Sequence, residues 1–153
     1  MSEITAPLNL EPQWFIPLFI VAWFGISALM SRIGGWSTLA THYRASQPES
    51  GERFRFVSGA MGKGLLPVFY NHCLFFTVNN NGLSISILFP FRFKNPPLFI
   101  PWSHIESVEE KQSLLNRYTV IRVANQWPII SVRGRVEQHI KEAYAIASPK
   151  PAF

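Results

Sequence analysis

The chain has 153 residues, of which 48% are hydrophobic and 15% are charged, and its formal net charge is +5. This length corresponds to one membrane anchor and one small domain. The single cysteine, Cys73, excludes an internal disulfide, which agrees with a cytoplasmic domain. The basic charge favours contact with anionic lipid headgroups. Nucleic acid is not an expected partner, because the sequence has neither a Lys/Arg run nor a nucleic-acid-binding motif.

An uncharged stretch over residues 12–31 predicts a membrane helix, preceded by a flexible N-terminal segment of residues 1–11. Twenty helical residues are about 30 Å long, which matches the hydrocarbon core of a bilayer. Proline is tolerated in the first turn of a helix but not in its interior. Because of Pro17, the regular helix is expected to begin near Trp14 and to continue through Ile33. We therefore assign residues 12–33 to a transmembrane helix.

Aromatic residues and flanking charges predict how this helix lies in a membrane. No Lys or Arg precedes the helix, whereas several follow it. The positive-inside rule then places the N-terminus outside and the C-terminal domain in the cytoplasm, in a single-pass protein of the inner (plasma) membrane. Aromatic side chains favour membrane interfaces. The predicted membrane-anchoring residues are Trp14, Phe15, Trp23, Phe24 and Trp36.

Two alternatives to a membrane helix remain open. A buried helix of a soluble core needs protein on every face, and the remaining residues, about 120, are too few to wrap it and also build a core. A cleaved signal peptide needs a positively charged N-terminal region, which the sequence lacks. Residues 25–27 nevertheless resemble a weak cleavage site.

Residues 34–50 are expected to form an interfacial helix and a linker. The two glycines at 34–35 end the membrane helix, and residues 46–51 have the composition of a loop. Between them, apolar residues recur at helical spacing and form a stripe that faces either lipid or the domain. These residues are Trp36, Leu39, Ala40 and Tyr43.

From residue 51 the hydrophobic period changes to two, which indicates β-strands. Asn79–Gly82 predicts a hairpin turn, because Asn and Gly accept positive φ angles. Further turns are expected at residues 59–64 and 125–126. The predicted strands are residues 53–57, 72–78, 83–89, 98–102, 105–111, 117–123 and 128–132.

A C-terminal amphipathic helix is predicted over residues 135–147, and a tail over 148–153. Within the helix, Glu137 and Lys141 are spaced to form an i, i+4 ion pair. The chain thus contains six or seven short strands followed by one helix.

This element order resembles that of a pleckstrin-homology-like barrel, in which the helix closes an open end of the curved sheet. Residues 80–87 and 100–105 resemble the GL-x-hydrophobic and IPW-x-x-I pattern of bacterial pleckstrin-homology-like domains, many of which lie beside membrane helices. Residues 88–102, with 34–36 and 43–44 upstream, resemble small bacterial membrane proteins. The resemblance covers roughly residues 30–145.

The resemblance implies an α+β fold with one N-terminal transmembrane helix, followed by a pleckstrin-homology-like curved antiparallel β-barrel or sandwich with a C-terminal helix. The β domain is then expected over residues 51–147. The resemblance implies no activity. Inositide-binding residues of eukaryotic pleckstrin-homology domains do not carry over, because the sequence has no matching motif.

Residues with catalytic or metal-binding chemistry are scattered. His72 and Cys73 are adjacent, but a lone cysteine at a strand start is most often a small core residue, and the other histidines occur singly. Ser103, His104 and Glu106 are the residue types of a triad, but a triad is assembled in space from separate elements. We therefore expect no metal, no cofactor and no enzymatic activity.

The loop over residues 90–97 holds the predicted binding residues Phe91, Arg92, Phe93 and Lys94. Aromatic side chains between cations suit insertion at lipid headgroups, and they equally suit docking on a partner protein. The alternative is that the phenylalanines fill the mouth of the barrel while the cations are merely solvated.

The predicted function is a membrane-anchored binding or assembly module. Its domain is expected to dock on a larger membrane protein complex as an accessory subunit, because the anchor already provides attachment to lipid. An alternative is binding of anionic lipid headgroups through Arg92 and Lys94. A further alternative is an unrecognised hydrolase or transferase that uses His104 or His72.

Overall fold

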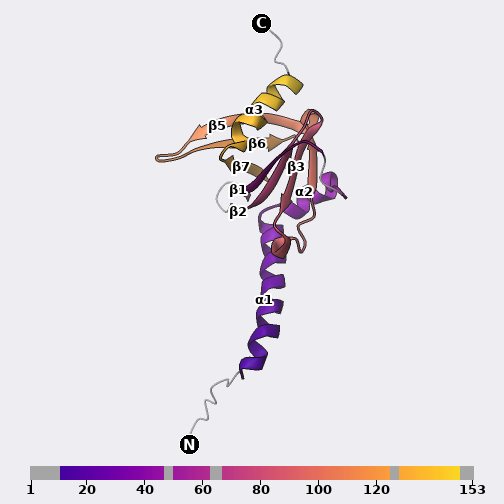
Figure 1. The fold of residues 1–153 in the computed structure, drawn as a ribbon, viewed down its shortest axis with the longest axis vertical. Helices are drawn as coiled ribbons and strands as arrows, with labels where there is room; N and C mark the ends of the chain where they lie inside the picture. Colours follow the sequence, from indigo (N-terminus) through magenta and orange to yellow (C-terminus); the bar gives the residue numbers. More distant parts are fainter. Residues whose placement is uncertain (1–10, 47–49, 63–66, 125–127, 149–153) are drawn as a thin grey trace, which may run out of the picture.

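The computed structural model describes residues 11–46, 50–62, 67–124 and 128–148. These residues form an α+β structure with an apolar N-terminal helix, a curled antiparallel sheet and a C-terminal helix (Figure 1). The predicted turn at 125–126, the segment before residue 11 and the tail beyond residue 148 lie outside the described residues. The helices are α1 (Pro12–Ile33), α2 (Trp36–Tyr43) and α3 (Val136–Ala147). The strands are β1 (Glu52–Gly62), β2 (Val68–Val78), β3 (Gly82–Ile87), β4 (Leu98–Pro101), β5 (Ile105–Gln112), β6 (Arg117–Val123) and β7 (Ile129–Arg133).

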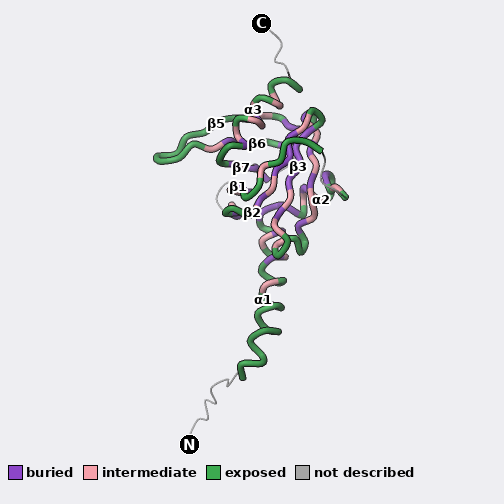
Figure 2. The backbone as a smooth tube through the Cα atoms, viewed as in Figure 1, coloured by how far each residue is buried: buried purple, intermediate pink, exposed green. Residues whose placement is uncertain are grey.

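Helix α1 is long and apolar enough to cross a membrane, and no other helix in the described ranges is. It begins at Pro12, the start of the assigned range and two residues before the expected start of the regular helix near Trp14, and it accommodates Pro17 near its start. Every residue from Glu11 to Ala22 is exposed, and burial begins only in the half of α1 nearest the domain (Figure 2). Helix α1 therefore projects from the domain, and most of its apolar surface is exposed.

The junction between α1 and α2 depends on the predicted glycine pair. Gly34 follows the last turn of α1, and Gly35 has φ +79°, which L side chains rarely adopt. Helix α2 then packs its apolar stripe on the domain, with Trp36 and Leu39 completely buried. Of the two predicted orientations of this stripe, the structure therefore has the one on the domain. Trp36 is a core residue here, and its predicted contact with a membrane interface is wrong.

All seven strands form one antiparallel sheet in the order β4-β3-β2-β1-β7-β6-β5. β1 lies at the centre and pairs with β2 on one side and β7 on the other. The sheet curls around a core that combines residues from both of its halves (Figure 1). Completely buried members of this core include Phe76, Ile85, Leu98, Ile121 and Ile130.

Several predicted strand boundaries are wrong, among them the start of β2, which is Val68 and not His72. Residues 59–62 were predicted as part of a turn, but they continue β1. A Cβ at Gly59 would lie 2.6 Å from the carbonyl oxygen of Ser131, so the close approach of β7 requires glycine here. Phe89 was predicted to end the strand over residues 83–89. Instead β3 ends at Ile87 and Phe89 begins a short 3-10 turn, because Pro90 cannot donate to a strand ladder.

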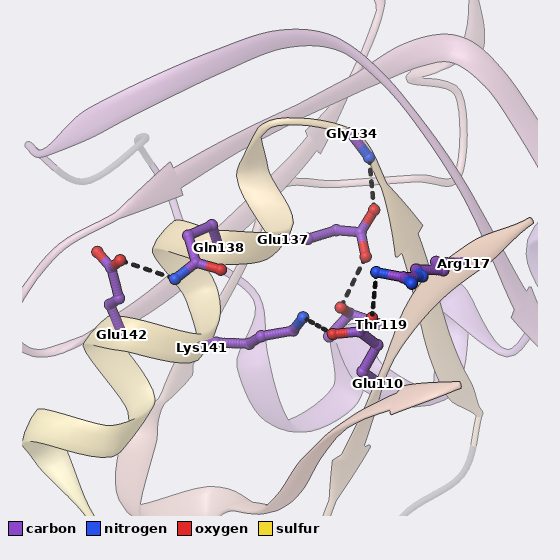
Figure 3. Close-up of polar contacts among 8 residues, drawn as sticks. All are labelled: Glu110, Arg117, Thr119, Gly134, Glu137, Gln138, Lys141 and Glu142. Atoms are coloured by element: carbon purple, nitrogen blue, oxygen red, sulfur yellow. Dashed lines mark hydrogen bonds and ion pairs between the residues drawn. The ribbon is translucent and has the colours of Figure 1, made fainter. Parts of the chain in front are cut away.

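Helix α3 packs on the core side of the sheet, where Val136 and Ile140 are buried. The predicted pair between Glu137 and Lys141 is absent from the described contacts (Figure 3). Glu137 instead accepts hydrogen bonds at 2.8 Å from the hydroxyl of Thr119 and from the N–H of Gly134, while Lys141 pairs with Glu110 on β5. Glu137 thus turns to the sheet because the buried Thr119 hydroxyl needs a partner.

Candidate functional site

The predicted binding loop lies against α1. Phe91 packs against Trp23 with tilted rings whose centroids are 5.0 Å apart, and Phe93 meets Phe24 edge-on at 4.6 Å. Phe91 is half-buried and also touches the edge of the core, whereas Phe93 is exposed. The two phenylalanines therefore join the loop to the helix, and they do not together fill the mouth of the barrel.

Side-chain hydrogen bonds from the helices fix the same loop. The indole N–H of Trp23 donates to the carbonyl of Pro90, the hydroxyl of Ser31 donates to that of Lys94, and the indole of Trp36 donates to that of Pro96. Each of these bonds is 2.8 Å long. Two of the predicted membrane-anchoring tryptophans, Trp23 and Trp36, thus also hold the loop.

The two predicted cations lie on the exposed side of this loop. The guanidinium Nε of Arg92 donates to the carbonyl of Ile87 at 3.1 Å, and the Nζ of Lys94 lies 5.7 Å from the centre of the Phe93 ring. Lys94 also has φ +62°, a conformation that is uncommon outside glycine. The four predicted binding residues therefore share one loop against α1, in which both cationic side chains are exposed.

A second candidate surface was not predicted. An open groove of about 1120 Å³ lies on the face of the sheet that turns away from the core. On β7, Ile129, Ser131 and Arg133 line the groove, while the alternating residues Ile130 and Val132 are buried in the core. The rest of the lining comes from β1, the start of β2, the β5–β6 hairpin and the beginning of α3.

The groove is strongly cationic. No aspartate or glutamate occurs among its described lining residues, and none of its Arg or Lys side chains forms an ion pair within the described ranges. Glu109 shares this face through its register with Val120 but lies outside the lining. The cations are Arg53, Arg55, Lys111, Arg133 and Arg135, and exposed or half-buried aromatic residues beside them are Phe56, Phe69 and Tyr118.

Backbone strain is concentrated at one side of the groove. Phe56 and His72 have φ angles of 55° and 53°, and the β1–β2 register shifts between Phe54 and Val57. The N–H of His72 donates to the hydroxyl of Ser58 at 3.1 Å, which holds the two strands together across the irregularity. Strained residues and bulges occur preferentially at functional sites, which makes this groove a candidate site.

The residues considered for catalysis lie apart. His104 contacts the hydroxyl of Tyr43 at 3.1 Å through Nδ1, and the described hydrogen bonds include none from His104 to Ser103 or Glu106. Burial raises the pKa of the Cys73 thiol, which disfavours the reactive thiolate. Within the described ranges, no three His, Cys, Asp or Glu residues are placed to hold a metal ion.

No protein-family model matches the sequence, and a search of curated proteins finds no significant match. The loop, the groove and α1 are therefore the features of the molecule that bear on its function.

Proposed function

We propose that this protein is a non-enzymatic binding module that α1 anchors to the inner membrane by a single span, with a pleckstrin-homology-like domain at the cytoplasmic surface. The apolar surface of α1 supports the span, because such a surface needs lipid or protein to cover it. The cations that follow the helix support the orientation. Seven antiparallel strands and a terminal helix packed on the core support the likeness to pleckstrin-homology-like domains.

The cationic groove is the structural feature that most supports the proposed binding function. Five positive side chains around one groove repel one another, and an anionic ligand relieves this repulsion when it binds. The groove is open and about 1120 Å³ in volume, and it combines cations with apolar and aromatic side chains. These properties suit an extended acidic segment of a partner protein, whose carboxylates meet the cations while its apolar residues contact the aromatic rings.

The proposed partner is therefore a subunit of a membrane protein complex that presents an acidic segment near the cytoplasmic surface. The anchor raises the local concentration of the domain beside such a partner, so that even a modest intrinsic affinity supports a stable assembly. In this arrangement the protein acts as an accessory subunit.

Native electrophoresis of the full-length tagged protein, extracted in mild detergent and followed by mass spectrometry, tests this function. We compare the wild type with a double variant in the groove, Arg53→Glu with Arg55→Glu. The matched control carries Arg44→Glu with Arg122→Glu, which makes the same change in charge at exposed positions outside the groove. We expect a discrete high-mass complex in the wild type and the control, and its loss in the groove variant.

Three results would contradict this function. Retention of the complex in the groove variant, or its equal loss in the groove variant and the control, would contradict the groove as the binding surface. A wild type that migrates alone would remove the protein partner. If that monomer binds vesicles containing phosphatidylglycerol through the groove cations, the alternative of lipid headgroup binding would replace the accessory-subunit function.

A further inference from the structure

The length of α1 determines how the domain and a membrane must meet. Its 22 residues are about 33 Å long, which is close to the thickness of a bilayer's hydrocarbon core. The part that is free of the domain, Pro12–Ala22, is roughly 16 Å long and is too short to span by itself. A span therefore includes the half of α1 that carries Trp23, Phe24 and Ser31, and with it the loop that these residues contact.

The hydrogen bonds of the loop suit a depth near the membrane surface. Backbone groups in contact with lipid must be satisfied within the protein. Every carbonyl from Ile87 to Lys94 except that of Phe93 accepts a hydrogen bond, including those from Trp23 and Ser31 of α1. The amides of Phe89, Phe93 and Lys94 have no such partner within the described residues, so these three groups require water or lipid headgroups as partners.

The exposed side chains of the loop form two groups, one apolar and one cationic. Phe89 is 79% exposed and Phe93 is 41% exposed, and Phe93 packs edge-on against Phe24 of α1. Arg92 and Lys94 are exposed as well, and Arg32 is an exposed cation at the end of α1. Apolar tips that reach acyl chains, with cations at the level of anionic headgroups, are typical of segments at a membrane interface.

We propose that the loop from Leu88 to Asn95 enters the lipid interface together with α1, as a second point of membrane contact. The contacts with Trp23, Phe24 and Ser31 couple the loop rigidly to the helix. The two elements together then fix the depth and the tilt of the domain, so that the cationic groove is held at a defined orientation to the membrane. This inference rests on the proposed function only in requiring that α1 spans.

Fluorescence quenching by brominated lipid tests the depth of the loop directly. In a Cys73→Ala background, which removes the only cysteine, we introduce Phe89→Cys or Phe93→Cys and attach an environment-sensitive fluorophore. The full-length protein is reconstituted in vesicles of phosphatidylcholine and phosphatidylglycerol whose acyl chains carry bromine. Phe19→Cys on α1 reports on the anchor, and Leu115→Cys, which is 92% exposed on the β5–β6 hairpin, is the aqueous control.

We expect the fluorophores at positions 89 and 93 to be blue-shifted and quenched, as at position 19, while the fluorophore at position 115 is neither. Quenching at position 19 but not at 89 or 93 would overturn the inference and leave the anchor intact. The absence of quenching at position 19 would instead overturn the membrane span, and the inference with it. These two failures are therefore distinguishable in one set of samples.

Discussion

Trp36 joins the anchor to the domain. Its side chain is completely buried, its indole donates to Pro96 at 2.8 Å, and its ring lies 5.9 Å from that of Tyr70. A tryptophan next to an apolar segment is expected at a membrane interface on composition alone. The contacts of the ring with the loop before β4 and with β2 are visible only in the structure, and they show that the ring belongs to the core.

We expect Trp36→Ala to lower the free energy of unfolding of the domain by about 3–5 kcal/mol, because it leaves a large cavity. Trp36→Phe keeps an aromatic ring but leaves the Pro96 carbonyl without its donor, and we expect it to cost about 1–3 kcal/mol. Denaturant unfolding in detergent micelles measures both. A reduced retention in membranes without a change in stability would contradict the core position of this residue.

At the scale of elements, the α1–α2 junction requires glycine at position 35. We expect Gly35→Ala to destabilise the domain by about 1–3 kcal/mol, because an L residue is strained at positive φ and its Cβ would overpack a filled site. The φ angle of Gly35 is +79°, and a Cβ at this position would lie 2.6 Å from Cδ of Pro128. Thermal unfolding measures the effect.

The control is Gly25→Ala in α1, where an added Cβ has nothing within 4 Å. Alanine is the better helix former, so this change should be neutral or slightly stabilising. Equal melting temperatures for the two variants would show that the turn after α1 does not need positive φ.

The contact between α3 and β5 predicts a pH dependence. The hydrogen bond and charge of Lys141 lower the pKa of Glu110 below its usual value. A carboxyl group with a lowered pKa in the folded state contributes stability above its unfolded pKa, and this contribution is lost as the pH falls through the folded pKa. We expect Lys141→Met to be slightly less stable than the wild type at about pH 7, and the gap to close below about pH 4.

Unfolding in denaturant across this pH range measures that gap. A gap that stays constant between neutral and acidic pH would assign the effect of Lys141→Met to lost packing on α3, since an ion pair with Glu110 requires an ionised carboxylate.

Elements that depend on local patterns could be predicted from the sequence. The uncharged run gave α1, the Asn-Asn-Asn-Gly turn gave the β2–β3 hairpin, and the alternation in residues 117–123 gave β6 to the residue. Elements that depend on distant partners could not. β1 extends through Gly59 because β7 pairs with it, and Glu137 turns away from Lys141 because Thr119 is buried beneath the helix.

At the scale of the whole molecule, the two candidate surfaces differ in how far the sequence revealed them. The loop cations and phenylalanines are neighbours in sequence, so their grouping was visible, although their contact with α1 was not. The groove collects cations from β1, β5, β7 and the start of α3, which only the sheet order β1-β7-β6-β5 brings together. The alternating residues Arg53–Val57 were the sole local signal, and they predicted no more than a half-buried strand.

The anchoring role of α1 underlies the proposed function and the membrane contact of the loop. Extraction of cell membranes with alkaline carbonate tests it most directly, using the full-length chain and a variant with Leu18→Arg and Val21→Arg. Each arginine near the centre of a span costs about 2.5–3.5 kcal/mol, and both positions are exposed on α1. We expect the wild type to remain in the membrane pellet and the variant to be released. Release of the wild type into the supernatant would contradict a membrane span.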